Sequence, residues 1–231
     1  MTHHTEPRGG LRVSVRELKL TAERHLMLHG VPKGVRPAVR DLVADAEALG
    51  LGALEWLDRP PRDGWRPPRR RAPGGAAVDA GGVPSLFVAP LLLDLVIAAA
   101  DRDGGAVLDV TGAPDPALLG ALVPAAHRYG ARLEAAVTGP DSARLRHLGA
   151  AAPTAADRAA APHGGRHLTA AVHGGFDVDA ALWWRLYHRS NDALTEDTPL
   201  SRGHAGALPA PGSGAPAASG TDPDYVAAGS G

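Results

Sequence analysis

Residues 84–130 read PSLFVAPLLLDLVIAAADRDGGAVLDVTGAPDPALLGALVPAAHRYG, and the order of elements within them sets the expected fold class. The apolar residues predict a mostly buried helix over Pro84–Asp101, a strand over Ala106–Val110 and a second helix over Asp115–Tyr129, which has Pro116 near its start. Strands that alternate with helices are typical of α/β proteins, in which at least some strands pair in parallel.

The alternation extends on both sides of this stretch. A short strand is predicted over Ala76–Ala80. After the second helix we expect a strand at Arg132–Val137, a short helix at Asp141–Leu148, a loop at Ala150–Gly165, a strand at His167–Val172 and a helix at Val178–Leu194. These elements predict an α/β core over residues 76–206, built on a mostly parallel or mixed sheet.

A pair of helices is expected before this core, over residues 13–57, after a flexible N-terminus at 1–12. Ser14-Val15-Arg16-Glu17 has the pattern of a capping box, in which the serine hydroxyl accepts from a first-turn N–H and the glutamate reaches back. The second helix is predicted to start near Arg36-Pro37 and to end at Gly50.

Two segments have too few apolar residues to join a packed core. Residues 58–75 are basic and proline-rich, which predicts an exposed extended linker, or alternatively an arm that contacts anions. Residues 207–231 consist largely of Pro, Gly, Ala and Ser, which predicts a disordered C-terminal tail.

Composition excludes several classes of function. Among the 231 residues, 24 lysines and arginines face 25 acidic residues, so no basic excess is present and we expect no nucleic-acid partner. The longest apolar stretch, near 86–100, contains Asp94 and is too short to span a bilayer, so we expect no membrane association. The chain has no cysteine, and Met1–Gly10 lacks the features of a secretory signal, which together favour a cytoplasmic protein.

Common catalytic and metal-binding motifs are absent. No dinucleotide-binding G-x-G-x-x-G follows a predicted strand, and the chain has neither a Walker A sequence nor a G-x-S-x-G elbow. His167 and His173 would share one face of the predicted strand, with His163 just before it. A third ligand at suitable spacing is missing, so we predict no metal site.

Five residues are candidates for binding a ligand. Asp109 interrupts an apolar strand, so its carboxylate either lines a site near the strand's C-terminal end or pairs with an arginine. His173 follows the predicted strand at His167–Val172. Ser201, Arg202 and His204 come after a helix that contains Trp183, Trp184 and Tyr187, and this combination suits a small-anion pocket or else a simple exposed helix end. The aromatic residues belong either to the core or to an interface such as that of a homodimer.

The first half of the chain resembles the malate/L-lactate dehydrogenase-type oxidoreductases. The resemblance lies in Val13–Leu18, Gly30-Val31-Pro32, Ala44–Gly50, Ala76–Gly82 and Asp103–Val110. It implies the scaffold of NAD(P)-dependent 2-oxoacid reductases that lack a classical Rossmann fold. The segment Ser201–Ala207 is also similar to the ending of an uncharacterised bacterial family that shares this opening.

The chain departs from the reductases at both histidine motifs. Where that family carries Ser-His-Gly, this sequence has Leu51–Trp56, and where the family carries Asn-His-x-Gly it has Thr111-Gly112-Ala113. Carbonyl reduction needs a proton donor beside the carbonyl, and none of the matching positions retains one. No catalytic residue is therefore carried over.

These observations favour a degenerate relative, a pseudoenzyme, that binds a small acidic metabolite or a protein partner as an accessory or regulatory protein. No cofactor is expected in that case. The alternative is an NAD(P)-dependent reductase or another small-molecule enzyme with a relocated site, using Asp109, His173, Arg202 or His204. A third hypothesis is a subunit whose surface is completed by a partner.

Overall fold

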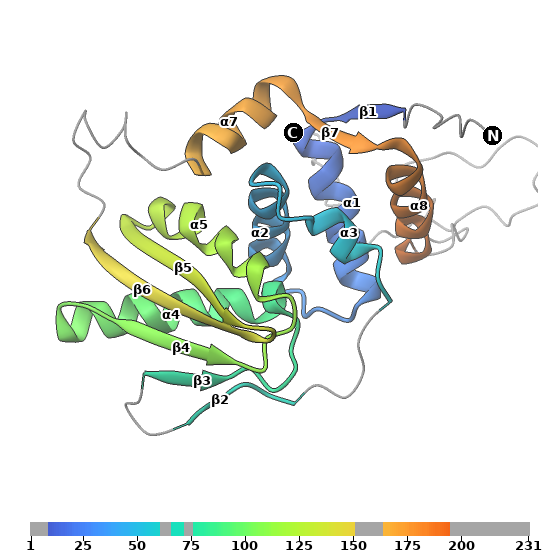
Figure 1. Cartoon of the computed structure of the whole chain (residues 1–231). Coiled ribbons are helices and arrows are strands. Elements are labelled where there is room, and N and C mark those ends of the chain that lie inside the picture. The colour runs from blue at the N-terminus through green and yellow to red at the C-terminus, as the bar shows by residue number, and fades with distance from the viewer. Residues whose placement is uncertain (1–8, 61–65, 72–75, 151–163, 195–231) are drawn as a thin grey trace, which may run out of the picture. The chain divides into compact units, whose positions relative to one another are not determined.

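A computed structural model describes residues 9–60, 66–71, 76–150 and 164–194 of the chain (Figure 1). Helices and strands alternate along the middle of the sequence and confirm the α/β class. The predicted helical pair is present as α1 (Val15–Leu28) and α2 (Arg36–Ala48), and a short third helix follows it before the main sheet. None of the described helices is both long and apolar enough to cross a membrane.

The main sheet is mixed and has five strands in the order β2-β3-β4-β6-β5. Only β3 and β4 pair in parallel, and α4 (Ser85–Asp103) joins them. The other pairs are antiparallel. The strands span Arg69–Arg70 (β2), Ala77–Asp79 (β3), Val107–Thr111 (β4), Ala131–Gly139 (β5) and Ser142–Ala150 (β6).

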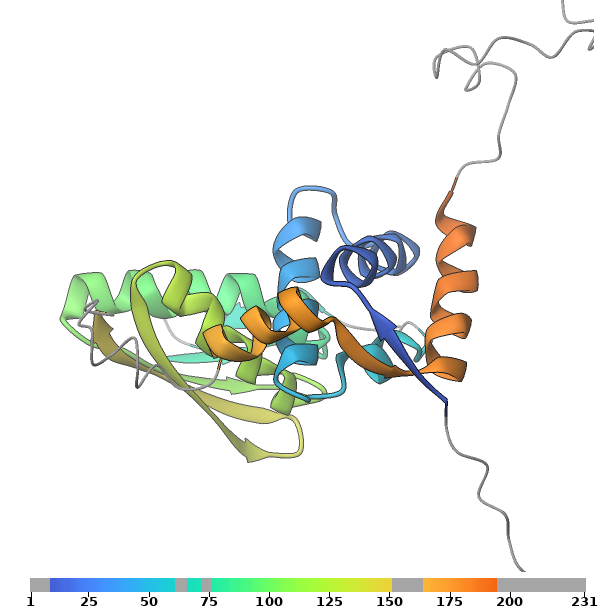
Figure 2. The ribbon, with the colours of Figure 1, turned by 90° about the horizontal axis from the view of Figure 1, so that it is seen from above.

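One face of this sheet is buried and the other is exposed. Leu108 and Val110 in β4 and Ala143 and Leu145 in β6 are buried, and they alternate with charged neighbours. Figure 2 shows α4 on one side of the strands. The short helices η1 (Pro116–Ala121) and α5 (Leu122–Arg128) supply further buried apolar side chains. An antiparallel sheet tolerates this arrangement because its outward side chains can be polar.

The helical part is held by a second, two-stranded sheet and by a local cap. Strand β1 (Gly10–Val13) pairs antiparallel with β7 (Phe176–Asp179), which leads directly into α8 (Ala180–Ser190) and a final turn, η2 (Asn191–Ala193). The predicted capping box at the start of α1 is confirmed, because the Glu17 N–H donates to Ser14 Oγ at 3.2 Å and the Ser14 N–H donates to Glu17 Oε2 at 2.9 Å.

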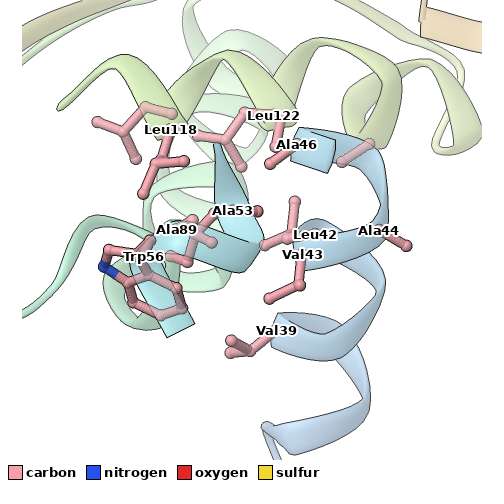
Figure 3. Packing of buried hydrophobic residues seen from close by; sticks show 14 of the residues in the cluster. Val39, Leu42, Val43, Ala44, Ala46, Ala53, Trp56, Ala89, Leu118 and Leu122 are labelled. Atoms are coloured by element: carbon pink, nitrogen blue, oxygen red, sulfur yellow. The ribbon is translucent and has the colours of Figure 1, made fainter. Parts of the chain in front are cut away.

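The apolar face of α2 forms the centre of the core (Figure 3). Val39, Leu42 and Val43 point toward the short helix α3 (Ala53–Leu57), and Leu118 and Leu122 lie above it. All five of these side chains are at most 3% exposed. When a large side chain in an interior of this kind is truncated, the free energy of unfolding falls by roughly 2–5 kcal/mol for leucine.

Two predicted elements are wrong, and a third begins later than predicted. Residues 141–148 do not form a helix but most of strand β6, because Ala143 and Leu145 face inward while Arg144 and Arg146 face outward, a period of two. Residues 167–172 do not form a strand but the middle of helix α7 (Gly164–Gly174). The last helix begins at Ala180 rather than Val178, since Phe176–Asp179 pairs with β1 and the Asp179 carboxylate accepts from the Leu182 N–H.

The structure also adds strands in two segments expected to be irregular. Gly10–Val13, partly within the predicted flexible N-terminus, forms β1, and Arg69–Arg70 of the predicted basic linker forms β2. Both are short: β2 consists of two arginines, and in β1 only Leu11 and Val13 alternate with a polar residue, Arg12. The predicted tail at 207–231 and the end of the predicted core at 206 lie outside the described residues.

Candidate functional site

A pocket of about 290 Å³ lies where α3, the start of η1 and the β5–β6 turn come together. It combines an aromatic wall, a guanidinium and a carboxylate with mostly apolar surroundings. Its lining consists of Leu51, Gly52, Trp56, Arg59, Asp115, Pro116, Ala117, Leu118, Val137, Gly139 and Pro140. Small-molecule sites have this character, with apolar walls and a few polar groups that fix the orientation of a ligand.

Trp56 forms the wall of the pocket, and two other rings pack against its side chain. Its ring lies edge-on to Phe87, with centroids 5.3 Å apart, and stacks with the His29 ring at 6.5 Å. Phe87 and His29 also meet edge to face at 6.0 Å. These three rings come from α3, α4 and the residue that caps the C-terminal end of α1, so the position of Trp56 depends on tertiary packing.

The His29 ring behind Trp56 is uncharged at neutral pH. Burial, and then the neighbouring His25, lower the pKa of His29 to about 4. The fully buried His25 contacts the Leu186 carbonyl oxygen through Nε2 at 2.8 Å, and burial also lowers its pKa. A neutral pair avoids placing a cation among apolar side chains, which would be costly.

The polar groups of the pocket are Arg59 and Asp115. Arg59 Nη1 donates to Asp115 Oδ1 at 2.7 Å. The carboxylate side chain is 26% exposed and the guanidinium 51%. A guanidinium has five N–H donors in a fixed fork, so Arg59 has further N–H groups able to donate to an anionic ligand.

Asp115 has a strained backbone. Its φ is +56° and its ψ is +54°, and it is the one residue other than glycine with positive φ in the described part of the chain. This left-handed conformation costs roughly 1–2 kcal/mol for residues with a β-carbon, although aspartate tolerates it better than most. Such strain tends to occur where a side chain must be held in a particular direction, here toward Arg59.

Of the residues proposed from the sequence, Asp109 does not line this pocket. It lies in β4 on the exposed face of the sheet, where Arg144 Nε donates to its Oδ1 at 2.7 Å. The strand is buried on one face only, so the carboxylate remains 45% exposed. The alternative of a pairing with arginine is therefore the one the structure contains.

The histidines near residue 170 do not share a face. His167 and His173 both lie in α7, and six residues along a helix place two side chains on different sides. His173 is exposed in the last turn of α7. Among the described residues no group of three His, Asp or Glu side chains is arranged to hold a metal ion. His163, Ser201, Arg202 and His204 lie outside the described residues.

The three aromatic residues of α8 divide between core and surface. Trp183 is 5% exposed, whereas Trp184 and Tyr187 are 48% and 40% exposed. The rings of Trp184 and Tyr187 meet edge to face at 5.7 Å, so part of this helix presents an aromatic surface.

Sequence reasoning missed the pocket because its polar residues are far apart in the chain. Arg59 and Asp115 are separated by 56 positions, and the β5–β6 turn adds a third segment. One signal was available in the sequence: Asp115-Pro116 marks a turn at the start of a helix, where an acidic side chain is often directed toward a partner.

Comparisons with known proteins give only weak similarity, and only among solved structures. No protein family matches the chain, and no curated protein matches it significantly. Among solved structures, the chain is similar to malate dehydrogenase from Pyrococcus horikoshii OT3, with 16% identity and a TM-score of 0.39. The match covers 60% of this chain and 45% of that chain. At this TM-score and identity the similarity assigns neither a family nor an activity to the chain.

Proposed function

We propose that this protein binds a small carboxylate-bearing metabolite in the Trp56 pocket and acts as an accessory or regulatory protein. The observation that carries the proposal is the Arg59–Asp115 pair at 2.7 Å beside the wall formed by Trp56. Asp115 holds one edge of the guanidinium, and the other N–H groups are suited to a carboxylate. The aromatic ring gives the apolar part of a metabolite a surface to pack against.

The same pocket argues against a reductase. Leu51–Trp56, the stretch that stands where the resembling reductases carry Ser-His-Gly, contributes Leu51, Gly52 and Trp56 to the lining. The described lining includes no histidine. A volume of about 290 Å³ is at the small end of ligand sites, which run from roughly 300 to 1,000 Å³, so it suits a metabolite of a few carbons better than a dinucleotide.

The test is a titration of the full-length protein with pyruvate, malate and succinate, followed by tryptophan fluorescence. We expect a saturable change, and a dissociation constant weakened by about tenfold in Arg59→Ala, because a charge-assisted hydrogen bond is lost. Arg185→Ala is the matched control, since Arg185 is similarly exposed and pairs with Asp58 at 2.8 Å, next to Arg59 in the sequence. Equal binding by wild type and Arg59→Ala would contradict the proposal.

A reductase with a relocated site is the alternative, and it would need NAD(P). Titration of the same protein with NADH and NADPH, following energy transfer from tryptophan, separates the two. Saturable binding of either dinucleotide, together with turnover of a 2-oxoacid, would overturn the accessory role and favour the enzyme.

A further inference from the structure

The exposed face of the five-stranded sheet gathers arginines from two distant parts of the chain. Arg144 and Arg146 alternate along β6, while Arg69 and Arg71 come from the basic segment at β2. Arg71 reaches across β3 to β4, where its Nη2 donates to Thr111 Oγ1 at 2.9 Å. Arg69 stands opposite Asp79 in the β2–β3 register, on the same side as Thr111. We call this surface the open face.

Positive charge is in excess on the open face. Arg144 pairs with Asp109, and Arg146 pairs with Glu134 on β5. Among the described residues neither Arg69 nor Arg71 forms an ion pair. Asp79, opposite Arg69, is the third carboxylate of this face, so four guanidinium groups face three carboxylates. The chain as a whole has a net charge of -1, so this local excess is not a consequence of composition.

The two existing ion pairs are open to exchange. Their four side chains are between 45% and 56% exposed. Exposed pairs of this kind contribute little to stability because water screens them. Each guanidinium can therefore turn from its own carboxylate to that of a partner without a large penalty.

The surface between these arginines suits an extended chain. A shallow pocket of about 360 Å³ is lined by Val107, Glu134, Ala136, Arg144 and Arg146, so short apolar side chains lie beside the cations. Arg144 and Arg146 are two residues apart in one strand, hence roughly 7 Å apart along it, which equals the repeat of alternate side chains in an extended peptide.

We propose that the open face binds an extended acidic segment of a protein partner, with glutamate or aspartate side chains paired to Arg144, Arg146, Arg69 and Arg71. Charge complementarity and matching spacing support a peptide. A nucleic acid fits less well, because the described residues of this face include no aromatic ring to stack a base. This inference is independent of the Trp56 pocket.

The experiment measures binding of the full chain to a fluorescein-labelled peptide of twelve alternating Glu and Ser residues, by anisotropy at low salt. We expect saturable binding that weakens as salt increases. The triple variant Arg69→Gln, Arg71→Gln, Arg144→Gln should bind at least about tenfold more weakly, as expected for the loss of several charge-assisted contacts.

The matched control is Arg12→Gln, Arg16→Gln, Arg185→Gln. It removes the same charge from exposed arginines, two of which pair with Asp177 and Asp58. Equal weakening by both triple variants would mean that net charge alone drives binding, and would overturn the proposal. So would the absence of saturable binding, or tighter binding of a labelled decauridine with the same dependence on Arg69, Arg71 and Arg144. Because no residue of this triple lines the Trp56 pocket, failure here leaves the metabolite titration unaffected.

Discussion

The helices packed around α2, which we call the helical layer, contain one aspartate–arginine pair, and the open face contains another. The two pairs differ in burial. In the helical layer Arg128 donates to both carboxylate oxygens of Asp45, at 3.0 and 2.7 Å, and the Asp45 side chain is 1% exposed. On the open face Asp109 and Arg144 are about half exposed. The same chemistry therefore has different consequences: the buried pair is part of what holds α2 to α5, while the exposed pair can be broken at little cost.

Burial also changes the pKa of Asp45. Burial raises the pKa of Asp45 above its ordinary value, although hydrogen bonds from Arg128 act in the opposite direction. Desolvation thus outweighs the attraction of the arginine. A carboxylate in this position depends on its partner, because alone it would be an uncompensated buried charge.

The largest effect expected is from removing that partner. Arg128→Ala should lower the free energy of unfolding by about 3 kcal/mol, the low end for breaking a buried pair, because Asp45 can take up a proton and Arg128 is itself partly exposed. Urea unfolding at pH 7 measures this. Arg144→Ala is the comparison on the open face and should leave the urea midpoint unchanged. Similar losses for both variants would remove the distinction between the two regions.

The second-largest effect is expected from acid, which should lower the stability of the helical layer. The folded-state pKa of His29, about 4, lies below that of the unfolded chain, roughly 6.5. The unfolded state therefore binds the proton first, and stability contributed by the neutral ring is lost as pH falls from 6.5 towards 4. We expect about 2 kcal/mol, after allowance for screening of a partly exposed ring.

Urea unfolding at pH 7 and at pH 4 measures the free energy of unfolding of wild type and of His29→Gln. The difference between the two proteins should be smaller at pH 4. The difference isolates His29 because Asp45, whose pKa is raised, acts with the opposite sign in both proteins. His127→Gln, on the exposed side of α5, is the control and should keep the pH dependence of the wild type. A constant difference for His29→Gln would show that the ring is charged or solvated in the fold.

A smaller effect is expected at the pocket between the two regions. Asp115→Gly and Asp115→Ala both remove the carboxylate, but only alanine keeps a β-carbon in the left-handed conformation. We expect the glycine variant to be more stable than the alanine variant by about 1 kcal/mol, the typical cost of that conformation. Both should lose affinity for carboxylates. Equal thermal midpoints for the two variants would show that the turn relaxes and stores no strain.

The smallest effect is expected on the open face. Asp109→Asn should leave the urea midpoint within error, because it removes one exposed ion pair. The same variant should bind the acidic peptide at least as tightly as wild type, since it frees Arg144 and removes a repelling charge. Weaker peptide binding by Asp109→Asn would mean that Asp109 orients Arg144 rather than competing for it.

Local sequence patterns predicted much of the fold correctly. The capping box at Ser14–Glu17, the helix over most of Pro84–Asp101 and the strand around Leu108 depend on residues within one turn or one strand, and each is present. The errors at 141–148 and 167–172 arose in short segments where helix and strand periods fit almost equally well. Pairing with β4 and β5 makes the first a strand.

The sequence by itself determined the α/β class, the helical pair and the absence of cysteine chemistry, because composition and periodicity are properties of the chain alone. Only the tertiary structure brought Arg59 to Asp115, placed the His29 and Phe87 rings against Trp56 and brought the Arg71 side chain to Thr111 in β4. The physical reason is that each of these contacts joins segments tens of residues apart, whose proximity is fixed by the packing of whole helices and strands and by no local preference.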